Sequence, residues 1–428
     1  MVPRPDYINQ LLAFKDKKLA KILSGVRRSG KSTVLTLYVE HLRKNGIQKN
    51  QIQEINLEDV DNEHLLDYKV LYSHIKKQLI PEKKNYIFLD EVQNVRNFQK
   101  TARSLLDRKN VDLYMTGSNS KMLSGEWATS LSGRYVEIHV LPLSFKEYVC
   151  CMNDYGNNKT AVSSGLQQIA GLQALYNQYI EFGSFPQAVV DFIKSAALTR
   201  TAIQQFLQGI YSTIVLKDVI DRQKENGVSV NLNTLDNIVK FMSGNIGNLT
   251  SPNNIANTMT SSGNSVSTPT VDSYLRAFCE SFILYRAGRF DIKGKKALQT
   301  LDKYYLVDMG FRYLLVGNKR DSDGYILENT VYLELLRRGY KVFVGKMTKK
   351  TNGEVKIIEV DFVAQKAGGI TEYYQVAPTT LEASTFKREI ASLEEIKDNY
   401  PKYLLSLDPG NNIHNGIHCQ NVLEWLIS

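Results

Sequence analysis

A glycine-rich segment near the amino terminus has the residue types and spacing of a phosphate-binding loop. The segment consists of Gly25, Val26, Arg27, Arg28, Ser29, Gly30, Lys31, Ser32 and Thr33. Its two loop glycines let the main chain turn tightly, so that N–H groups face an anion at the start of a helix. In this pattern the lysine reaches the β- and γ-phosphates and the serine hydroxyl ligates Mg²⁺. We therefore expect ATP and Mg²⁺ as cofactors, with Lys31 acting on phosphate and Ser32 on the metal.

A second chemical signal comes about sixty residues later, where an apolar strand, Tyr86–Leu89, ends in Asp90 and Glu91. Two carboxylates at a strand end are, taken alone, typical of a solvated turn. After a phosphate-binding loop they are instead the expected second half of the site. We expect Asp90 to hold Mg²⁺ through its water shell and Glu91 to orient the water that attacks the γ-phosphate.

The next apolar strand, Val111–Thr116, runs into Gly117, Ser118 and Asn119. A polar side chain at this point would lie between the two halves of the site, where a γ-phosphate sensor belongs. Ser118 or Asn119 is the candidate, and capping of a following helix by Ser118 is the alternative. Arg134 lies too far along the chain to be interpreted from spacing alone, and the alternative for it is a surface arginine.

The overall composition describes a folded α/β multidomain protein. The 428 residues, 43% of them hydrophobic, favour two to four domains. No run of 18 apolar residues is present, and the first ten residues lack the apolar segment of a secretory signal, so we expect no membrane partner. Four cysteines without metal-binding spacing favour a reducing, cytoplasmic environment. The formal charge of +9 permits contact with nucleic acid but does not establish it.

Four motifs carry a family resemblance. GVRRSGKS, IFLDEVQ, TGSNS and LSGR, in this order, resemble the AAA_14 group of AAA+ and related P-loop ATPases over about residues 4–148. The resemblance implies an ATPase domain at residues 1–150 with a parallel sheet, and it supports the roles given above. It makes Arg134 a candidate arginine finger worth roughly 10³–10⁵-fold in turnover, with a second copy of the chain as a candidate partner. Arg27 and Arg28 receive no role beyond positive potential near phosphate.

The middle of the chain is predicted to be helical. Apolar residues at helical spacing between Thr199 and Asn226 favour a packed helical lid or connector over residues 151–230. Residues 231–315 contain three predicted helices and then a hairpin, which is the order of a winged helix-turn-helix. We expect the third helix, Thr268–Glu280, to be the recognition helix.

Duplex DNA is a candidate partner of this region, because cationic residues cluster around the hairpin and would contact phosphates. They are Arg286, Arg289, Lys293, Lys295 and Lys296. The alternative is a solvated hairpin tip in a domain that binds proteins. Asp272 and Glu280 on the recognition helix weaken the prediction of base readout.

Residues 316–428 show the order helix–strand–strand–strand–helix–strand, which is similar to the restriction-endonuclease-like fold. Glu328, Asp361 and Gln375 lie where such sites bind Mg²⁺, but Ala377 stands where the lysine that positions water is expected. Lys387 on the following helix is a candidate substitute. The segments LENTVYLEL, EVDFVA and YYQVA resemble the DUF4143 domain that follows ATPases of this type, which implies a degenerate nuclease used for docking or as a scaffold.

The sequence thus favours an Mg²⁺-dependent ATPase that couples hydrolysis to conformational change, with DNA as a candidate target. One alternative is a nucleotide-gated DNA-binding switch with slow turnover. Another is an Mg²⁺-dependent nuclease. His414 and His418 have helical spacing, but neighbouring asparagines and Gly416 predict a loop there rather than a metal site.

Overall fold

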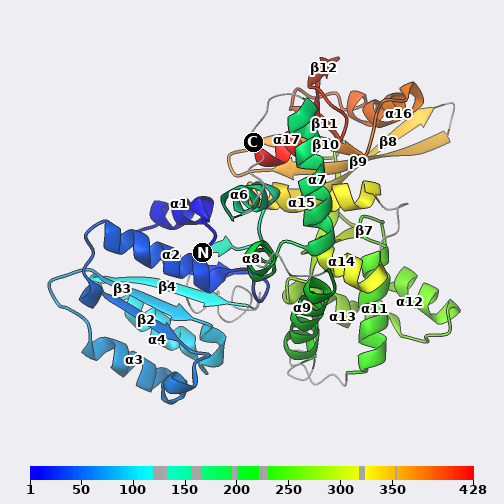
Figure 1. Ribbon diagram of the computed structural model, residues 1–428. Coiled ribbons are helices and arrows are strands. Elements are labelled where there is room, and N and C mark those ends of the chain that lie inside the picture. Colours follow the sequence, from blue (N-terminus) through cyan, green and yellow to red (C-terminus); the bar gives the residue numbers. More distant parts are fainter. Residues whose placement is uncertain are drawn as a thin grey trace. The chain divides into compact units, whose positions relative to one another are not determined.

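The structure is a computed structural model, and it separates into two compact units, which Figure 1 shows with their elements labelled. The first comprises Met1–Pro142 with Glu280–Phe282, and the second Leu143–Cys279 with Ile283–Ser428. The residues described are 1–118, 131, 133–155, 166–194, 200–220, 223, 230–317, 323–351 and 354–428. Among these residues, none of the helices combines the length and the apolar character that a membrane span requires.

The first unit is built on a five-stranded parallel sheet with the order β2-β3-β4-β1-β5. The strands are β1 Ala20–Ser24, β2 Ile52–Asn56, β3 Asn85–Asp90, β4 Val111–Gly117 and β5 Tyr135–His139. Its helices are α1 Pro5–Ala13, α2 Lys31–Lys44, α3 Tyr68–Lys77 and α4 Phe98–Leu106, with short 3₁₀ turns η1 Lys49–Gln51, η2 Val60–Leu65 and η3 Val92–Asn94. All residues of β1 and β4 are buried, as expected for parallel strands covered on both faces.

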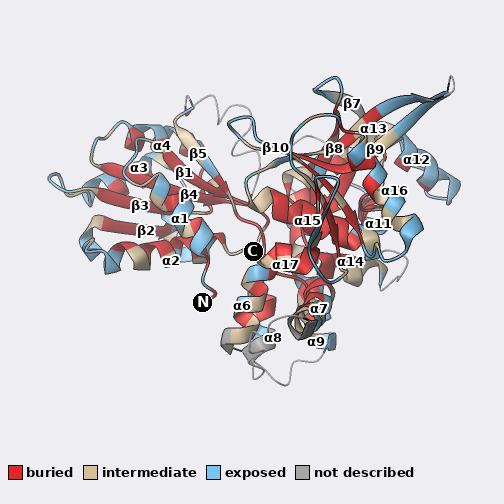
Figure 2. Cartoon of the chain, turned by 90° about the horizontal axis from the view of Figure 1, so that it is seen from above, coloured by how far each residue is buried: buried red, intermediate tan, exposed pale blue. Residues whose placement is uncertain are grey.

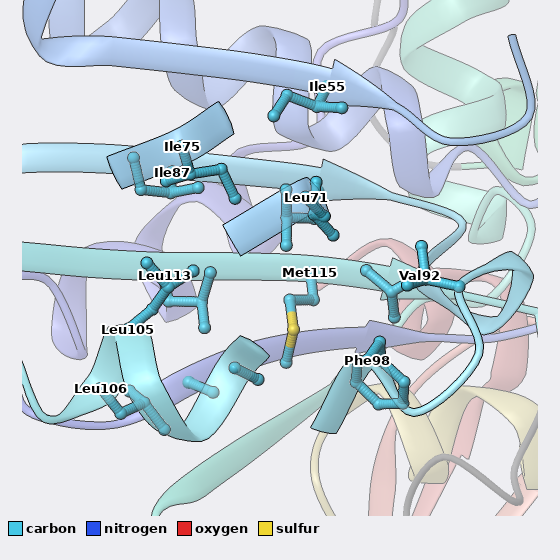
Figure 3. Packing of buried hydrophobic residues seen from close by; sticks show 14 of the residues in the cluster. Ile55, Leu71, Ile75, Ile87, Val92, Phe98, Leu105, Leu106, Leu113 and Met115 are labelled. Atoms are coloured by element: carbon cyan, nitrogen blue, oxygen red, sulfur yellow. The ribbon is translucent and has the colours of Figure 1, made fainter. Parts of the chain in front are cut away.

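Apolar clusters cover both faces of this sheet. On one face, residues of α3 and α4 such as Leu71 and Leu105 pack on Ile87 and Met115 (Figure 3). On the other, α1 and α2 pack on Leu23, Phe88 and Tyr114. Burial of one such side chain contributes about 1.5–3 kcal/mol. The sheet is therefore a rigid base for the loops at the carboxyl ends of its strands.

The second unit combines helices with an eight-stranded mixed sheet, ordered β12-β13-β11-β10-β9-β8-β6-β7. Its strands are β6 Leu284–Asp291, β7 Lys296–Leu306, β8 Lys341–Thr351, β9 Glu354–Gln365, β10 Thr371–Ala377, β11 Lys402–Ser406, β12 Asn412–His414 and β13 Ile417–Asn421. Its helical segments are α6 Phe145–Tyr155, α7 Leu166–Phe182, α8 Pro186–Lys194, α9 Arg200–Thr213, the π-helical turn η5 Ile214–Val219, α11 Leu232–Gly244, α12 Pro252–Ser261, α13 Thr268–Glu280, α14 Met309–Val316, α15 Asp323–Arg337, α16 Ala383–Glu394 and α17 Val422–Ile427. Figure 2 shows α15 as one of its most buried helices.

The hairpin β6–β7, predicted as the wing of a winged helix, belongs to this large sheet. Strand β6 pairs in parallel with β8, with Arg289 opposite Val344 and Asp291 opposite Lys346. The segments predicted as a winged helix and as a nuclease-like domain therefore share one hydrogen-bonded sheet. Helices α11, α12 and α13 precede the hairpin in the predicted order, and their winged-helix assignment stays a prediction.

The region of His414 and His418 corrects the sequence interpretation. Its composition predicts a loop, but the structure shows a hairpin in which Ile413 of β12 pairs with His418 of β13. Asn415 and Gly416 form the turn with φ angles of 49° and 77°, a conformation that asparagine and glycine tolerate best. Of the residues that predict a loop, Asn415 and Gly416 form the two-residue turn between β12 and β13. The described residues contain no group of three His, Cys, Asp or Glu arranged for a metal ion.

Candidate active site

The predicted phosphate-binding loop connects β1 to α2 at the carboxyl edge of the parallel sheet. Gly25, Arg28 and Gly30 have positive φ angles of 142°, 64° and 97°. A Cβ atom on Gly25 would lie 2.2 Å from the main-chain oxygen of Val140, so only glycine fits there. Gly30 caps α2 without a side-chain hydrogen bond, and the first N–H groups of α2 have no partner within the helix. The loop therefore has the geometry of an anion site.

The side chains of the loop fit a phosphate ligand. The Lys31 ammonium is buried and donates to the main-chain oxygens of Gly25 and Val26, at 3.0 Å each. The Ser29 hydroxyl is buried and has no hydrogen-bond partner among the described atoms. Arg27 pairs with Glu58 at 2.9 Å, whereas Arg28 is exposed and Thr33 half-buried. The cationic head of Lys31 is thus held over the loop by carbonyl groups of the loop itself.

The two predicted metal ligands, Ser32 and Asp90, lie together. Burial raises the pKa of Asp90 above its ordinary value, and the side chains of Thr116 and Ser32 act in the opposite direction. Thr116 also accepts a hydrogen bond from the main-chain N–H of Glu91, at 2.9 Å. Because Thr116 donates to Asp90 as well, one hydroxyl fixes both carboxylate positions at the end of β3.

The buried side chain of Glu91 has two polar neighbours. Its main chain has a φ angle of 53°, which turns the chain sharply after Asp90. The Ser118 hydroxyl donates to Glu91 Oε2 at 3.4 Å, and the Gln93 amide donates to the same oxygen. Gln93 Oε1 is buried without a hydrogen-bond partner in the described structure. Asn119, the other predicted sensor, lies outside the described residues.

Two of these contacts were missed by sequence reasoning. Gln93 is two positions beyond Glu91 in the segment DEVQ, and its amide lies 3.4 Å from the Ser118 hydroxyl. Thr116 is the polar residue near the end of an otherwise mostly apolar strand. Both signals are local and could have been used, because a hydroxyl or amide at a strand end next to two carboxylates is a natural hydrogen-bond partner.

Arg4 was also missed, and no local pattern marks it. Its side chain is buried, with Nη1 3.0 Å from the main-chain oxygen of Ser29 and Nη2 2.9 Å from that of Leu141. The guanidinium carbon lies 4.6 Å from the centre of the Tyr7 ring, and the Tyr7 hydroxyl accepts the N–H of Leu141 at 3.1 Å. Arg4 therefore supports the phosphate-binding loop from behind.

Arg134 lies near the amino end of β1, whereas the phosphate-binding loop follows the carboxyl end of the same strand. Its main-chain oxygen accepts the N–H of Ala20, the first residue of β1, whereas the loop follows Ser24 at the other end. The length of that strand, at about 3.3 Å per residue, separates Arg134 from the loop by roughly 16 Å. Its side chain pairs with Asp107 at 2.8 Å. An arginine finger in this position would have to act on another copy of the chain.

The cationic residues predicted for DNA contact do not form one surface. Lys293, Lys295 and Lys296 are exposed at the hairpin tip, and Arg286 pairs with Asp302 at 2.7 Å. Arg289 is only 6% exposed, which excludes it from a phosphate-binding surface. The pairing of β6 with β7 shifts register between Ala287 and Arg289, so Arg286 and Arg289 lie on either side of an irregularity in the strand.

The predicted degenerate nuclease residues meet around a lysine that the sequence did not suggest. Lys303 of β7 lies 2.9 Å from Glu328, 2.9 Å from Glu359 and 3.9 Å from Asp361. Gln375 accepts the main-chain N–H of Asp361 at 3.3 Å. Burial, followed by the charge of Glu328, raises the pKa of Asp361 well above its ordinary value.

The expected lysine substitute is corrected accordingly. Ala377 is buried and brings no cation, and the proposed replacement, Lys387, is exposed on α16. Lys303 supplies the ammonium instead. A cavity of about 670 Å³ lies beside this cluster, and Glu359, Gln375, Lys356 and Arg388 are among the residues that line it.

Comparison with family models finds two matches. Residues 17–149 match AAA_14, described as an AAA domain, and residues 173–322 match DUF8612, a domain of unknown function. The first match covers the phosphate-binding loop and β3. The second extends over the predicted lid and winged helix, and the DUF4143 domain expected from the sequence is not shown.

Relatives match over most of the chain. An uncharacterized protein of Haemophilus influenzae is 37% identical over 429 residues, which cover 100% of this chain and 99% of the relative. An uncharacterized protein of Methanocaldococcus jannaschii is 31% identical over 381 residues, covering 88% of this chain and 79% of the relative. Among solved structures, a Walker-type ATPase of Pyrococcus abyssi aligns with 74% of this chain and 96% of its own, at 13% identity and a TM-score of 0.46. By the identity and coverage of the Haemophilus relative, the chain belongs to the same family as that protein, and its residues 17–149 form an AAA domain of the AAA_14 type.

Proposed function

We propose that the chain hydrolyses ATP with Mg²⁺ at the carboxyl edge of the parallel sheet, and that this cycle drives a conformational change in its second half. The observation that carries the proposal is the buried ammonium of Lys31, held at 3.0 Å by two carbonyls of the glycine-rich loop, with the Ser32 side chain close to the Asp90 carboxylate. A hydroxyl, a carboxylate and a lysine on a glycine-rich loop are the groups that nucleotide hydrolysis requires.

In this proposal the N–H groups of residues 25–32 and the Lys31 ammonium hold the phosphates, while Ser32 and Asp90 hold the metal. Bound Mg²⁺ supplies neutralisation of the charge that develops on the phosphates. Glu91 orients the attacking water and accepts its proton. Ser118 and Gln93 position Glu91 through the hydrogen bonds to its Oε2, and Asn119 is proposed as a further contact to the γ-phosphate.

The test uses Lys31→Ala and Glu91→Gln in the purified full chain, with phosphate release and nucleotide binding measured in parallel. Lys31→Ala is expected to bind ATP more weakly. Glu91→Gln is expected to retain binding and to lose roughly 10²–10⁴-fold in turnover, the usual contribution of a general base. Lys44→Ala, on the exposed last turn of α2, is the matched control and should behave as the parent. Parental turnover in both site variants would refute the proposal.

We also propose Arg134 as a finger acting between copies, because its own loop is out of reach. Mixing Arg134→Ala with Glu91→Gln tests this: each variant supplies what the other lacks, so the mixture should hydrolyse ATP faster than either alone. An Arg134→Ala protein with parental activity, or a mixture no faster than its parts, would remove Arg134 from the mechanism.

A second candidate function, nucleotide-gated DNA binding, is favoured by the way two hairpins join. The N–H of Ile292 donates to the oxygen of Lys346 at 3.0 Å, and the Lys293 ammonium donates to that of Thr348 at 2.7 Å. The end of the β6–β7 hairpin therefore lies against the second half of β8. We name the three exposed lysines at the end of β6–β7 the hairpin lysine surface, which comprises Lys293, Lys295 and Lys296.

Such a surface would contact phosphates of duplex DNA and release counterions. Binding of a fluorescent duplex at two salt concentrations, with and without ATP, tests it. Lys295→Ala combined with Lys296→Ala should weaken binding and reduce the salt slope, whereas Lys76→Ala with Lys77→Ala on α3 should change neither. Absence of binding, or binding without a salt slope, would exclude this function.

The finer domain assignments remain proposals: a lid at residues 151–230, a winged helix at 231–315 and a nuclease-like or DUF4143-type domain at 316–428. The shared sheet of the second unit supports treating the last two as parts of one folded body.

A further inference from the structure

A buried cluster in the second unit joins three carboxylates to a single ammonium. Glu328 comes from α15, Glu359 and Asp361 from β9, and Lys303 from β7. Glu328, Asp361 and Lys303 are each less than 10% exposed, and only the Glu359 side chain, at 33%, has substantial exposure. The elements that would carry a nuclease's carboxylates thus converge here on a lysine.

Several oxygen atoms of the cluster already accept hydrogen bonds. Glu328 Oε1 accepts from Lys303 at 2.9 Å and from the Tyr305 hydroxyl at 2.6 Å. Asp361 Oδ2 accepts the main-chain N–H of Val376 at 2.9 Å, and Oδ1 faces Lys303. Lys303 is thus the cation that faces both carboxylates, and its removal would leave them without a positive charge between them.

The side chain of Gln375 also has hydrogen-bond partners in the protein. Its Oε1 accepts the Asp361 N–H and the Ser392 hydroxyl, at 3.3 Å and 3.2 Å, and its amide nitrogen donates to Glu389 at 2.9 Å. Mg²⁺ demands near-ideal octahedral oxygen geometry at about 2.0–2.1 Å. With Lys303 between the carboxylates, and with Glu328 Oε1, Asp361 Oδ2 and Gln375 Oε1 already accepting hydrogen bonds, this ligand set is poorly suited to that demand.

We infer that the Lys303 ammonium takes the place of a divalent cation in this cluster. It lies within 2.9 Å of two carboxylates and 3.9 Å of the third, and so supplies the positive charge that a nuclease obtains from a bound metal. The cluster then binds β7, α15 and β9 together, takes up no Mg²⁺ and cleaves no phosphodiester. This inference goes beyond the proposed ATPase function and is independent of it.

The central test is a gain of metal binding. Lys303→Met keeps most of the aliphatic stem but removes the ammonium, which leaves three carboxylates without their counter-ion. Titration of metal-free full chain with Mn²⁺, in the absence of nucleotide and monitored by electron paramagnetic resonance, should show one bound ion per chain more than the parent. The added site should disappear in Lys303→Met combined with Asp361→Asn. Lys341→Met, an exposed lysine on β8, is the matched control and should bind as the parent.

Measurements on the parent keep the inference falsifiable if Lys303→Met does not fold. The parent should bind no Mn²⁺ that Asp361→Asn removes, and should leave plasmid DNA intact with Mg²⁺ or Mn²⁺. A Mn²⁺ site or a cleavage activity in the parent that Asp361→Asn abolishes would overturn the inference, as would a folded Lys303→Met without the added site. Phosphate release from ATP, followed separately, reports on the ATPase proposal and decides nothing about the cluster.

Discussion

Arg4 Nη1 lies 3.0 Å from the main-chain oxygen of Ser29, so a residue before the first helix holds the phosphate-binding loop in place. The same guanidinium donates to Leu141 at the end of the first unit. Gly25 of the loop also lies against Val140, so closely that any side chain at this position would collide with the Val140 oxygen. The Arg4 side chain thus connects three segments of the first unit: the amino terminus, the phosphate-binding loop and the segment around Leu141.

Substitution of Arg4 should therefore weaken nucleotide binding. Arg4→Ala removes two hydrogen bonds from a charged donor, each worth about 1.5–3 kcal/mol, and should raise the Kd for ATP and lower Tm. Arg4→Lys should restore little, because an ammonium cannot span two carbonyls as a planar guanidinium does. Equilibrium binding of a fluorescent ATP analogue and thermal unfolding measure the two effects. An Arg4→Ala protein that binds ATP as tightly as the parent would contradict the bracing role.

Thr116 should matter for turnover although it touches no nucleotide in the proposed mechanism. Thr116→Val preserves shape but removes the donor to Asp90 and the acceptor of the Glu91 N–H. Loss of a hydrogen bond to a charged group, about 1.5–3 kcal/mol, corresponds to a fall in kcat of roughly 10–100-fold. Thr116→Ser keeps the hydroxyl and serves as the control. Steady-state phosphate release is the measurement, and equal kcat in parent and Thr116→Val would refute the prediction.

The pH dependence of hydrolysis should follow Asp90. Burial raises its pKa above 3.8, so between that value and the raised pKa the folded state holds a proton that the unfolded chain has lost. The contribution of Asp90 to the free energy of unfolding therefore decreases as the pH rises through this window and is constant above it. Because a metal ligand must be ionised, activity should increase with pH over the same window. Thr116→Val should move this acid limb of kcat/KM to higher pH, since it removes a hydrogen bond that lowers the pKa; superimposable limbs would disprove the assignment.

A buried ion pair should control the stability of the first unit. Lys21 and Asp112 have fully buried side chains, and the Tyr114 hydroxyl donates to the same carboxylate at 2.8 Å. Lys21→Met leaves this charge without its cation and should cost about 3–5 kcal/mol in the free energy of unfolding. The double variant with Asp112→Asn should cost less than the sum of the single changes. Denaturant unfolding measures both, and additive costs would show that the pair is not coupled.

The parts of the site that lie close together in the sequence could be predicted from it. The loop of residues 25–33 has a local pattern, and the strand predicted at Tyr86–Leu89 extends from Asn85 to Asp90. Apolar runs bounded by polar residues identify such strands because parallel strands are buried on both faces. The bounds shift by a residue or two because strand ends depend on pairing with neighbours.

The remaining parts depend on contacts between distant residues. Arg4 is 137 residues from Leu141, and Lys303 is 25 residues from Glu328, so no local spacing relates them. The parallel pairing of β6 with β8 is of the same kind. The hairpin at His414 escapes prediction for a different reason: β12 is an exposed edge strand, so its residues lack the alternation of a half-buried strand.

The membership of β6 and β7 in the large sheet limits how the chain can be divided. A recombinant fragment starting after residue 315 would lose both strands and leave the edge of β8 around Val344 unpaired. Unpaired strand edges of this kind promote edge-to-edge aggregation. The same cut would remove Lys303 and leave the carboxylates of Glu328 and Asp361 buried without a cation. We therefore expect that residues 316–428 need the preceding hairpin in order to fold, and that a transfer of this region to another protein should include it.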